Sequence, residues 1–194
     1  MTKFLMLSLL GCPAVLETKD NLSTDTTANE EIIPTQFGII DTDNCDQETI
    51  GSTVCNMIFY DQNKDVWQLF DHEGKVIILD FSTVWCTPCQ NAGHFVQPIQ
   101  DDYGDKIEFV TVLIEGMTGA PPTEEEINEW VTSHGITTAP VLYADRSVSD
   151  PTGANGYLIG GFPTYVFITK DLKIDSGAVG FNEQHVRSTI DGLL

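Results

Sequence analysis

The pattern of apolar and polar positions predicts regular structure from about residue 56 to the C-terminus. Short alternating or continuous apolar runs, separated by polar turns, are typical of strands. Predicted strands cover Met57–Tyr60, Val66–Leu69, Lys75–Phe81, Ile107–Ile114, Val141–Tyr143, Tyr165–Thr169 and Lys173–Val179. Predicted helices cover Cys86–Tyr103, the residues between a capping box at Thr123–Glu126 and Gly135, and the residues after the cap Asn182.

The order of these elements predicts an α/β domain. The first two strands flank the polar turn 61–65 and form a β-hairpin. Lys75–Phe81 is an apolar run, as expected for a central strand that is buried on both faces. Strands and helices then alternate, and an antiparallel pair and a helix close the sheet. We therefore expect a mixed central sheet flanked by helices on both faces, with an N-terminal hairpin extension.

The N-terminus predicts export. Met1–Gly11 carries Lys3 followed by an apolar run that is far too short to span a bilayer, which is typical of a signal peptide. The segment 9–12 resembles the bacterial lipobox, in which the cysteine, here Cys12, is lipidated and becomes the first mature residue. It departs from that pattern at Leu10, where a smaller residue is more usual. An ordinary signal peptide and an apolar start without function are the alternatives.

A polar stretch follows this start. Residues 17–36 are rich in Thr, Asn, Asp and Glu, a composition that buries too little apolar surface to order itself. We therefore expect a signal peptide at 1–11, a lipidated, disordered tether at 12–50 and a folded domain at 51–194. The tether would hold the domain at the cell envelope of a bacterium, facing the periplasm or the exterior.

The composition excludes one class of partner. Nine basic side chains stand against 29 acidic ones, so the 194 residues carry a net charge of −20. This charge repels phosphate backbones and offers no basic face, so we expect no nucleic acid as a partner. It also keeps the domain away from anionic lipid, so membrane attachment would depend on Cys12.

Two cysteines carry the candidate chemistry. Cys86 and Cys89 are separated by two residues at the junction of a predicted strand and a predicted helix. Free backbone N–H groups and the helix dipole favour a thiolate at Cys86, and Cys89 lies one turn later, where it can resolve a mixed disulfide. A structural disulfide and half of a zinc site are the alternatives. A zinc site would need two further ligands, and no second pair with ligand spacing follows.

Two motifs carry a family resemblance. The segment 80–89, which ends in Trp85-Cys86-Thr87-Pro88-Cys89, resembles the thioredoxin active site, and 160–164 resembles the cis-proline loop of that family. The span from about residue 51 to 194 is most similar to the TlpA/ResA and redoxin branch of envelope-bound oxidoreductases. This resemblance implies a thioredoxin fold.

The resemblance also implies roles near the cysteines. Pro163 would be cis and would expose backbone groups of Phe162 to an extended client strand beside Cys86, with Trp85 and Thr164 also at the client site. A plain loop proline is the alternative. Asp80 would be buried and would take the proton from Cys89, whereas a solvated strand-end carboxylate is the alternative.

Other residues depart from the thioredoxin pattern. No lysine partner for Asp80 is evident, and His94 occupies the position of the proline that kinks the active-site helix. Pro98 is the alternative position for this kink. We expect His94 on the helix surface. Glu115 ends the second buried strand and resembles only loosely an acid near the active site of the ResA-like branch.

The upstream pair Cys45 and Cys55 has two interpretations. In an exported protein, two cysteines ten positions apart most simply form a structural disulfide that attaches the tether to the domain. The alternative is an electron relay to Cys86 and Cys89.

These observations predict an enzyme that exchanges disulfides with protein substrates outside the cytoplasm. It would need no metal and no organic cofactor, would receive electrons from an upstream donor, and by resemblance would act as a reductant. A peroxiredoxin is the second hypothesis, because Thr83 and Cys86 satisfy half of that motif; Arg146 and Arg187 are the only arginines that could steady its thiolate. A protein that binds a metal ion or a partner without catalysis is the third.

Overall fold

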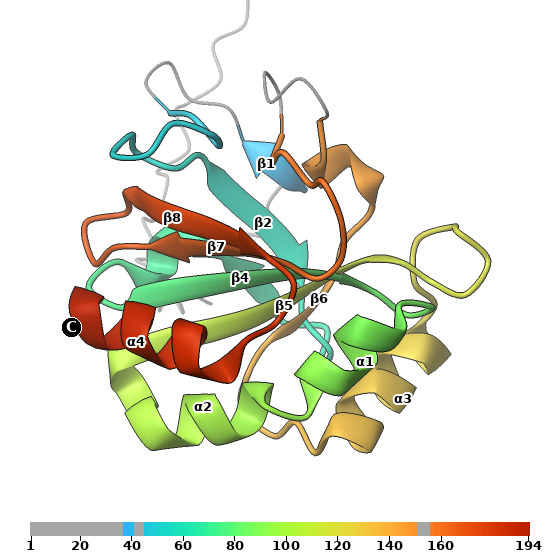
Figure 1. The fold of residues 1–194 in the computed structure, drawn as a ribbon. Helices are drawn as coiled ribbons and strands as arrows, with labels where there is room; N and C mark the ends of the chain where they lie inside the picture. Colours follow the sequence, from blue (N-terminus) through green and yellow to red (C-terminus); the bar gives the residue numbers. More distant parts are fainter. Residues whose placement is uncertain (1–36, 41–44, 151–155) are drawn as a thin grey trace, which may run out of the picture. The chain divides into compact units, whose positions relative to one another are not determined.

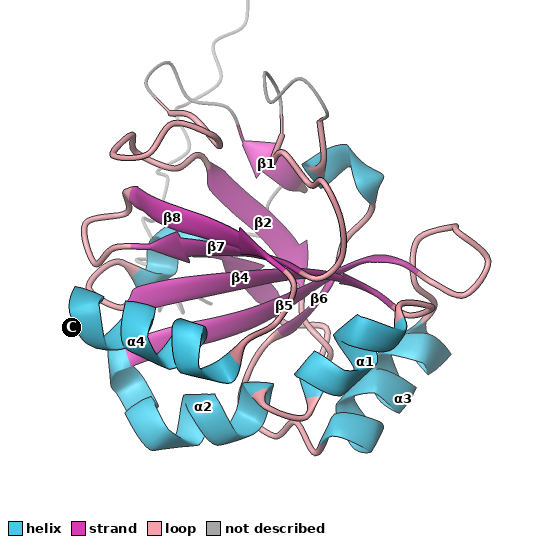
Figure 2. Ribbon diagram, viewed as in Figure 1, coloured by secondary structure: helices cyan, strands magenta, loops and turns pink. Residues whose placement is uncertain are grey.

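The computed structural model describes residues 37–40, 45–150 and 156–194, all within the unit Ile33–Leu194. The predicted signal peptide and Cys12 lie outside the described residues. The strands are β1 (Gly38–Ile40), β2 (Asn56–Tyr60), β3 (Val66–Gln68), β4 (Val76–Thr83), β5 (Ile107–Glu115), β6 (Val141–Tyr143), β7 (Thr164–Ile168) and β8 (Ile174–Val179) (Figure 1). The helices are α1 (Thr87–Gly93), α2 (Val96–Tyr103), α3 (Glu124–His134) and α4 (Glu183–Leu193), with the short 3₁₀ helices η1 (Leu69–His72), η2 (Gly104–Lys106) and η3 (Arg146–Val148) (Figure 2).

The strands form two sheets. The larger sheet has five strands in the order β6-β5-β4-β7-β8, and the smaller has three in the order β1-β2-β3. Strand β4 is parallel to β5 and antiparallel to β7, so the predicted mixed sheet is confirmed. Its central strand is β4, which corresponds to the predicted strand Lys75–Phe81. The predicted hairpin is also confirmed, because β2 and β3 pair antiparallel.

Strand β4 separates two apolar cores. Ile77, Leu79 and Phe81 pack in one core with side chains of the three-stranded sheet. Val76 and Ile78 face the other way and pack with side chains of all four α-helices. The helices therefore cover one face of the five-stranded sheet, and the small sheet covers the other. The prediction of helices on both faces is wrong, because the hairpin supplies the second covering layer.

The packed part of the chain reaches upstream of residue 51. Strand β1 pairs antiparallel with β2, with Gly38 opposite Ile58. Cys45 and Cys55 are joined by a disulfide, with their Cα atoms 4.8 Å apart. Next to this disulfide, the backbone N–H of Gly51 donates to the carbonyl oxygen of Ile174 over 2.7 Å. The disulfide therefore closes the loop 45–55, and the hydrogen bond of Gly51 attaches this loop to the first residue of β8.

The predicted single helix at 86–103 is interrupted. Helix α1 ends at Gly93 and α2 begins at Val96, so the break lies at His94 and Phe95 rather than at Pro98. Pro98 has no N–H to donate to the carbonyl of His94, the residue four positions earlier, which weakens an unbroken helix at this point. His94 is exposed, as predicted.

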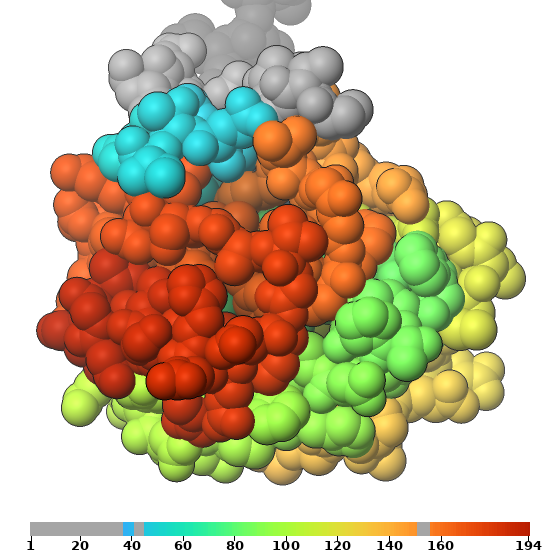
Figure 3. Space-filling model, viewed as in Figure 1, coloured from blue at the N-terminus to red at the C-terminus, as the bar shows by residue number. Residues whose placement is uncertain are grey.

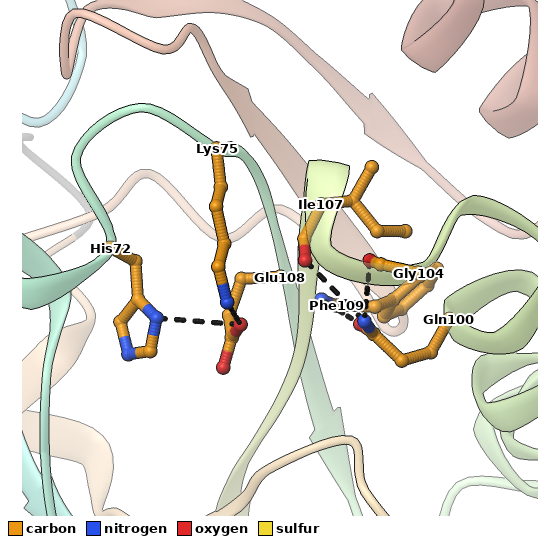
Figure 4. Close-up of polar contacts among 7 residues, drawn as sticks. All are labelled: His72, Lys75, Gln100, Gly104, Ile107, Glu108 and Phe109. Carbon is orange, nitrogen blue, oxygen red and sulfur yellow. Dashed lines mark hydrogen bonds and ion pairs between the residues drawn. The ribbon is translucent and has the colours of Figure 1, made fainter.

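Polar contacts fix the first residues of β4 and β5 (Figure 4). Glu108 forms ion pairs with Lys75 over 2.8 Å and with His72 over 3.3 Å. The side-chain amide of Gln100 on α2 accepts from the N–H of Phe109 over 2.8 Å and donates to the carbonyl of Ile107 over 3.4 Å. These contacts set the register at the end of the sheet that lies away from the Cys86–Cys89 segment.

A buried histidine joins α1 to α3. One ring nitrogen of His134 lies 2.9 Å from the carbonyl oxygen of Gln90, and the other lies 2.7 Å from that of Trp130. The ring fits against Gly93, where a β-carbon would lie 2.6 Å from a His134 ring carbon. Close approach of the two helices therefore requires glycine at position 93.

We expect Gly93→Ala to destabilise the protein by roughly 1 to 3 kcal/mol, because the added methyl group overlaps a buried and hydrogen-bonded ring. Urea unfolding measures this change. The matched control is Gly192→Ala in α4, where a β-carbon meets no atom within 4 Å. That control should be neutral or stabilising by up to about 1 kcal/mol, from the higher helix propensity of alanine. Equal stabilities of the two variants would contradict the packing assigned to His134.

Candidate active site

The dithiol segment lies where the central strand meets the helical layer. Strand β4 ends at Thr83, and Cys86 is the N-cap of α1 with extended backbone angles (φ −83°, ψ 107°). Pro88 in the first turn suits the helix start, where a missing N–H costs nothing. Cys86 and Cys89 are joined by a disulfide, with their Cα atoms 5.2 Å apart.

The two sulfurs differ in exposure and in surroundings. Cys86 is 5 % exposed and Cys89 is fully buried, so Cys86 offers the reachable sulfur. The backbone N–H of Cys89 also points at the Cys86 sulfur over 3.2 Å. An N–H donor and a helix start both stabilise negative charge, so a reduced Cys86 is placed to be a thiolate. This confirms the geometry that the spacing predicted.

Asp80 lies below this segment in the middle of β4. It is two residues from Ile78 and four from Val76, so the three side chains share one face of the strand. The side chain of Asp80 therefore faces the helical layer that also contains Cys89. The hydroxyl of Ser82 donates to one carboxyl oxygen over 2.7 Å, and within the described residues the other oxygen has no hydrogen-bond partner. Complete burial raises the pKa of Asp80 to about 7.

The neighbours of Asp80 in the sheet are polar but uncharged. Thr111 on β5 and Tyr165 on β7 are its partners in register, and both are buried. Neither hydroxyl has a hydrogen-bond partner among the described residues. Within the described part of the chain, no ion pair involves Asp80, which agrees with the absence of a lysine at position 111. Without a cation nearby, Asp80 keeps a raised pKa.

The loop before β7 lies beside the dithiol segment. The Phe162–Pro163 peptide bond is cis, as predicted. The ring of Phe162 meets the indole of Trp85 edge to face, with ring centroids 5.9 Å apart. Thr164 donates from its hydroxyl to the carbonyl of Gly161 over 2.6 Å, which steadies the loop. Figure 3 shows this orange-red loop bordering the green residues of α1 on the molecular surface.

Glu115 and Arg146 hold Trp85 in place. The indole N–H of Trp85 donates to Glu115 over 2.9 Å, and the Arg146 guanidinium forms an ion pair with the same carboxylate. This hydrogen-bonded pair with Arg146 lowers the pKa of Glu115. In the sequence, Glu115 has only a loose resemblance to an active-site acid, and its ion pair with Arg146 was not predicted. The available signal was a carboxylate at the end of a largely apolar strand, because a buried charge needs a partner.

The remaining candidate residues lie elsewhere. Cys55 is next to Val54, whose N–H donates to the carbonyl of Leu172 at the turn between β7 and β8. This turn lies at the opposite end of the sheet from Cys86, because β7 runs antiparallel to β4. The disulfide of Cys45 and Cys55 therefore does not form a relay to the dithiol.

Neither arginine required by the peroxiredoxin hypothesis contacts the dithiol. Arg146 is paired with Glu115, and Arg187 is paired with Asp102 and Glu183. The structure gives no support to a thiolate steadied by arginine. Among the described residues, no group of three or more His, Cys, Asp or Glu side chains is arranged to hold a metal ion.

The fold and the paired cysteines define a thioredoxin-fold protein with a disulfide at the start of α1, in which only Cys86 retains any exposed surface. No family model matches the chain. It is 29 % identical over 109 residues to the thiol-disulfide oxidoreductase ResA of Oceanobacillus iheyensis, a match that covers 56 % of this chain and 51 % of that protein. The chain thus matches about half the length of this curated relative.

Solved structures agree with this assignment. The exposed lipoprotein thioredoxin of Streptococcus pneumoniae superposes with a TM-score of 0.57 at 26 % identity, over 71 % of this chain and 99 % of that one. A DsbF homologue from Corynebacterium diphtheriae superposes with a TM-score of 0.63 at 18 % identity, over 81 % and 100 %. The chain therefore has a thioredoxin fold and is similar in sequence to proteins named thiol-disulfide oxidoreductase.

The raised pKa of Asp80 predicts that the free energy of unfolding falls as the pH rises. Its folded-state pKa of about 7 lies above the unfolded value near 4, so between these values only the folded state holds the proton. Stability from this group is therefore complete below about pH 4 and is lost as pH rises to about 7, by on the order of 3 to 4 kcal/mol. In the oxidised protein the cysteines do not titrate.

Urea unfolding of the oxidised protein between pH 4 and 8 measures this loss. Asp80→Asn should remove the decline, so the stability of the variant relative to wild type rises across this window and stays constant above it. Asp105→Asn at an exposed position is the control and should keep the decline. A decline of the same size in Asp80→Asn would show that another group causes it.

Proposed function

We propose that the protein is a thiol-disulfide oxidoreductase that acts on protein disulfides through Cys86 and Cys89. The observation that carries this proposal is the pair itself: the two sulfurs are within bonding distance, and Cys86 is slightly exposed whereas Cys89 is fully buried. The curated relatives bearing the name thiol-disulfide oxidoreductase support the same chemistry.

The reaction has two exchange steps. In the reduced protein the Cys86 thiolate attacks one sulfur of the client disulfide, forming a mixed disulfide and releasing the first client thiolate. Cys89 then loses its proton, and its thiolate attacks the Cys86 sulfur. The second client thiolate leaves, and the Cys86–Cys89 disulfide remains. A dithiol donor returns this disulfide to the reduced state by the same exchanges in reverse.

Asp80 is our candidate for the group that accepts the Cys89 proton. It shares the helical face of the sheet with Cys89, and its pKa of about 7 lies close to neutral pH. An acid with a pKa near the working pH can both take and return a proton. Ser82 orients the carboxyl group, and the oxygen without a partner is available to the proton.

Client binding is assigned to the loop beside Cys86. By the resemblance of residues 160–164 to the cis-proline loop of thioredoxins, we propose that backbone groups of Phe162 beside Pro163 pair with an extended client strand. Trp85 is 45 % exposed and contacts Phe162, so these rings provide an apolar surface for the client. Thr164 steadies the same loop. No metal or organic cofactor enters this mechanism.

The direction and location of the activity belong to the same proposal. Similarity to ResA supports a reductant, with an upstream dithiol as the electron donor. The described part of the chain contains no helix long and apolar enough to cross a bilayer. We propose attachment through a lipidated Cys12 and a location outside the cytoplasm at the bacterial envelope.

The exchange mechanism predicts different behaviour for the two cysteines. Wild-type protein should accelerate the reduction of insulin by dithiothreitol, and Cys86→Ser should abolish this acceleration. Cys89→Ser should accumulate a mixed disulfide between Cys86 and insulin, because the resolving thiol is absent; mass spectrometry after acid quenching detects it. The control Cys45→Ser/Cys55→Ser should retain the acceleration. Activity in Cys86→Ser, or no acceleration by wild type, would favour a binding protein.

The anchor is tested independently of the chemistry. Full-length protein expressed in a bacterial host with labelled palmitate should carry the label, and Cys12→Ser should not. Leu10→Ala, which brings the segment closer to the usual lipobox, should be labelled at least as strongly. Wild-type protein without label would rule out the lipoprotein and leave an ordinary signal peptide or an apolar start.

A further inference from the structure

A groove of about 800 Å³ lies next to the dithiol segment. Val84 and Gln90 line one side, and residues of α3 line the other. Gln90 directly follows Cys89 and donates from its side-chain amide to the carbonyl of Val84 over 2.7 Å. The wall of the groove is therefore continuous with the turn that contains both cysteines.

The groove and the cis-proline loop lie on different flanks of the dithiol. Strand β4 leads into the dithiol, and β5 and β7 lie on opposite sides of β4. Pro163 precedes β7, whereas α3 follows β5 and leads into β6 (Figure 1). A client strand beside Pro163 would leave this groove free for another part of the same client.

The rim of the groove is acidic. Glu124, Glu125 and Glu129 line it and are exposed. Lys64 forms an ion pair with Glu124 over 3.2 Å, and Glu126 is held in the capping box with Thr123. Of the described residues, none forms an ion pair with Glu125 or Glu129.

Two further features of α3 point to a ligand. Glu125 and Glu129 are one turn apart, and like charges at this spacing destabilise a helix. Trp130 also lines the groove; it is 2 % exposed, and its indole N–H has no partner among the described residues. A cation beside Glu125 and Glu129 would remove the repulsion, and the buried indole N–H of Trp130, a residue that lines the same groove, is a donor left unsatisfied by the described residues.

We infer that this groove binds a cationic segment of the client polypeptide, so that the protein selects disulfides flanked by Lys or Arg. This inference rests on the proposed function and names its substrate class. Attraction between opposite charges raises the rate of encounter most at low ionic strength. The chemistry at the sulfurs is the same for every client, so the groove would act on the encounter and not on the exchange step.

The test uses two synthetic peptides with the same intrachain disulfide, flanked by Lys in one and by Glu in the other. The second-order rate constant of the reduced protein with each peptide is followed by protein fluorescence at low and high salt. We expect the Lys peptide to react roughly three- to tenfold faster at low salt and the difference to shrink at high salt. Glu125→Gln/Glu129→Gln should bring the ratio of the two rate constants close to one.

The control removes two charges at the other end of the sheet. Glu73→Gln/Asp105→Asn makes the same change in net charge at exposed positions next to the starts of β4 and β5, and it should keep the wild-type ratio. A ratio near one in wild type, or an equal fall in both double variants, would overturn the groove and leave the oxidoreductase intact. A reduced protein that reacts with neither peptide would overturn the proposed function and the groove with it.

Discussion

The arrangement of the whole unit depends on the burial of β4 on both faces. Every residue from Val76 to Thr83 is buried, so the strand needs an apolar layer on each side. The helices supply one layer and the three-stranded sheet supplies the other. Because β4 is central and leads directly to Cys86, the layers that cover the strand also fix the position of the dithiol. A change in the packing of either core would therefore also move Cys86.

Asp80 is the ionisable group in this buried strand, and its burial shows how environment assigns chemistry. Desolvation without a nearby cation raises its pKa to about 7. Glu115 is also buried and lies on the neighbouring strand, but its ion pair with Arg146 lowers its pKa. One carboxyl group can therefore exchange a proton near neutral pH while the other stays charged and holds Trp85. The stability lost at Asp80 agrees with the proposed role of this residue, because perturbed pKa values cluster at functional sites.

Much of the fold could be predicted because its signals are local. The capping box at Thr123 and the cap at Asn182 mark helices by their own side chains, and long apolar runs mark the central strands. The cysteine pairs and the cis Pro163 followed from spacing and family motifs. Strand β1 was not predicted, because it lies just after the polar stretch 17–36 and is defined by its pairing with β2, which is a tertiary contact. The partner of Arg146 and the common face of the helices depend on tertiary contacts that no local pattern contains.

The net charge of −20 gains meaning once it is placed on the structure. Solubility is served by acidic residues at any exposed position, including the far end of the sheet. Glu125 and Glu129 instead repel each other on one helix, beside a groove whose other wall adjoins the dithiol. On the opposite flank the surface is aromatic, through Trp85 and Phe162. A polypeptide bound across the dithiol, as proposed, would meet an apolar surface on one side and negative charge on the other, and this asymmetry would give the two ends of the bound chain different chemical requirements.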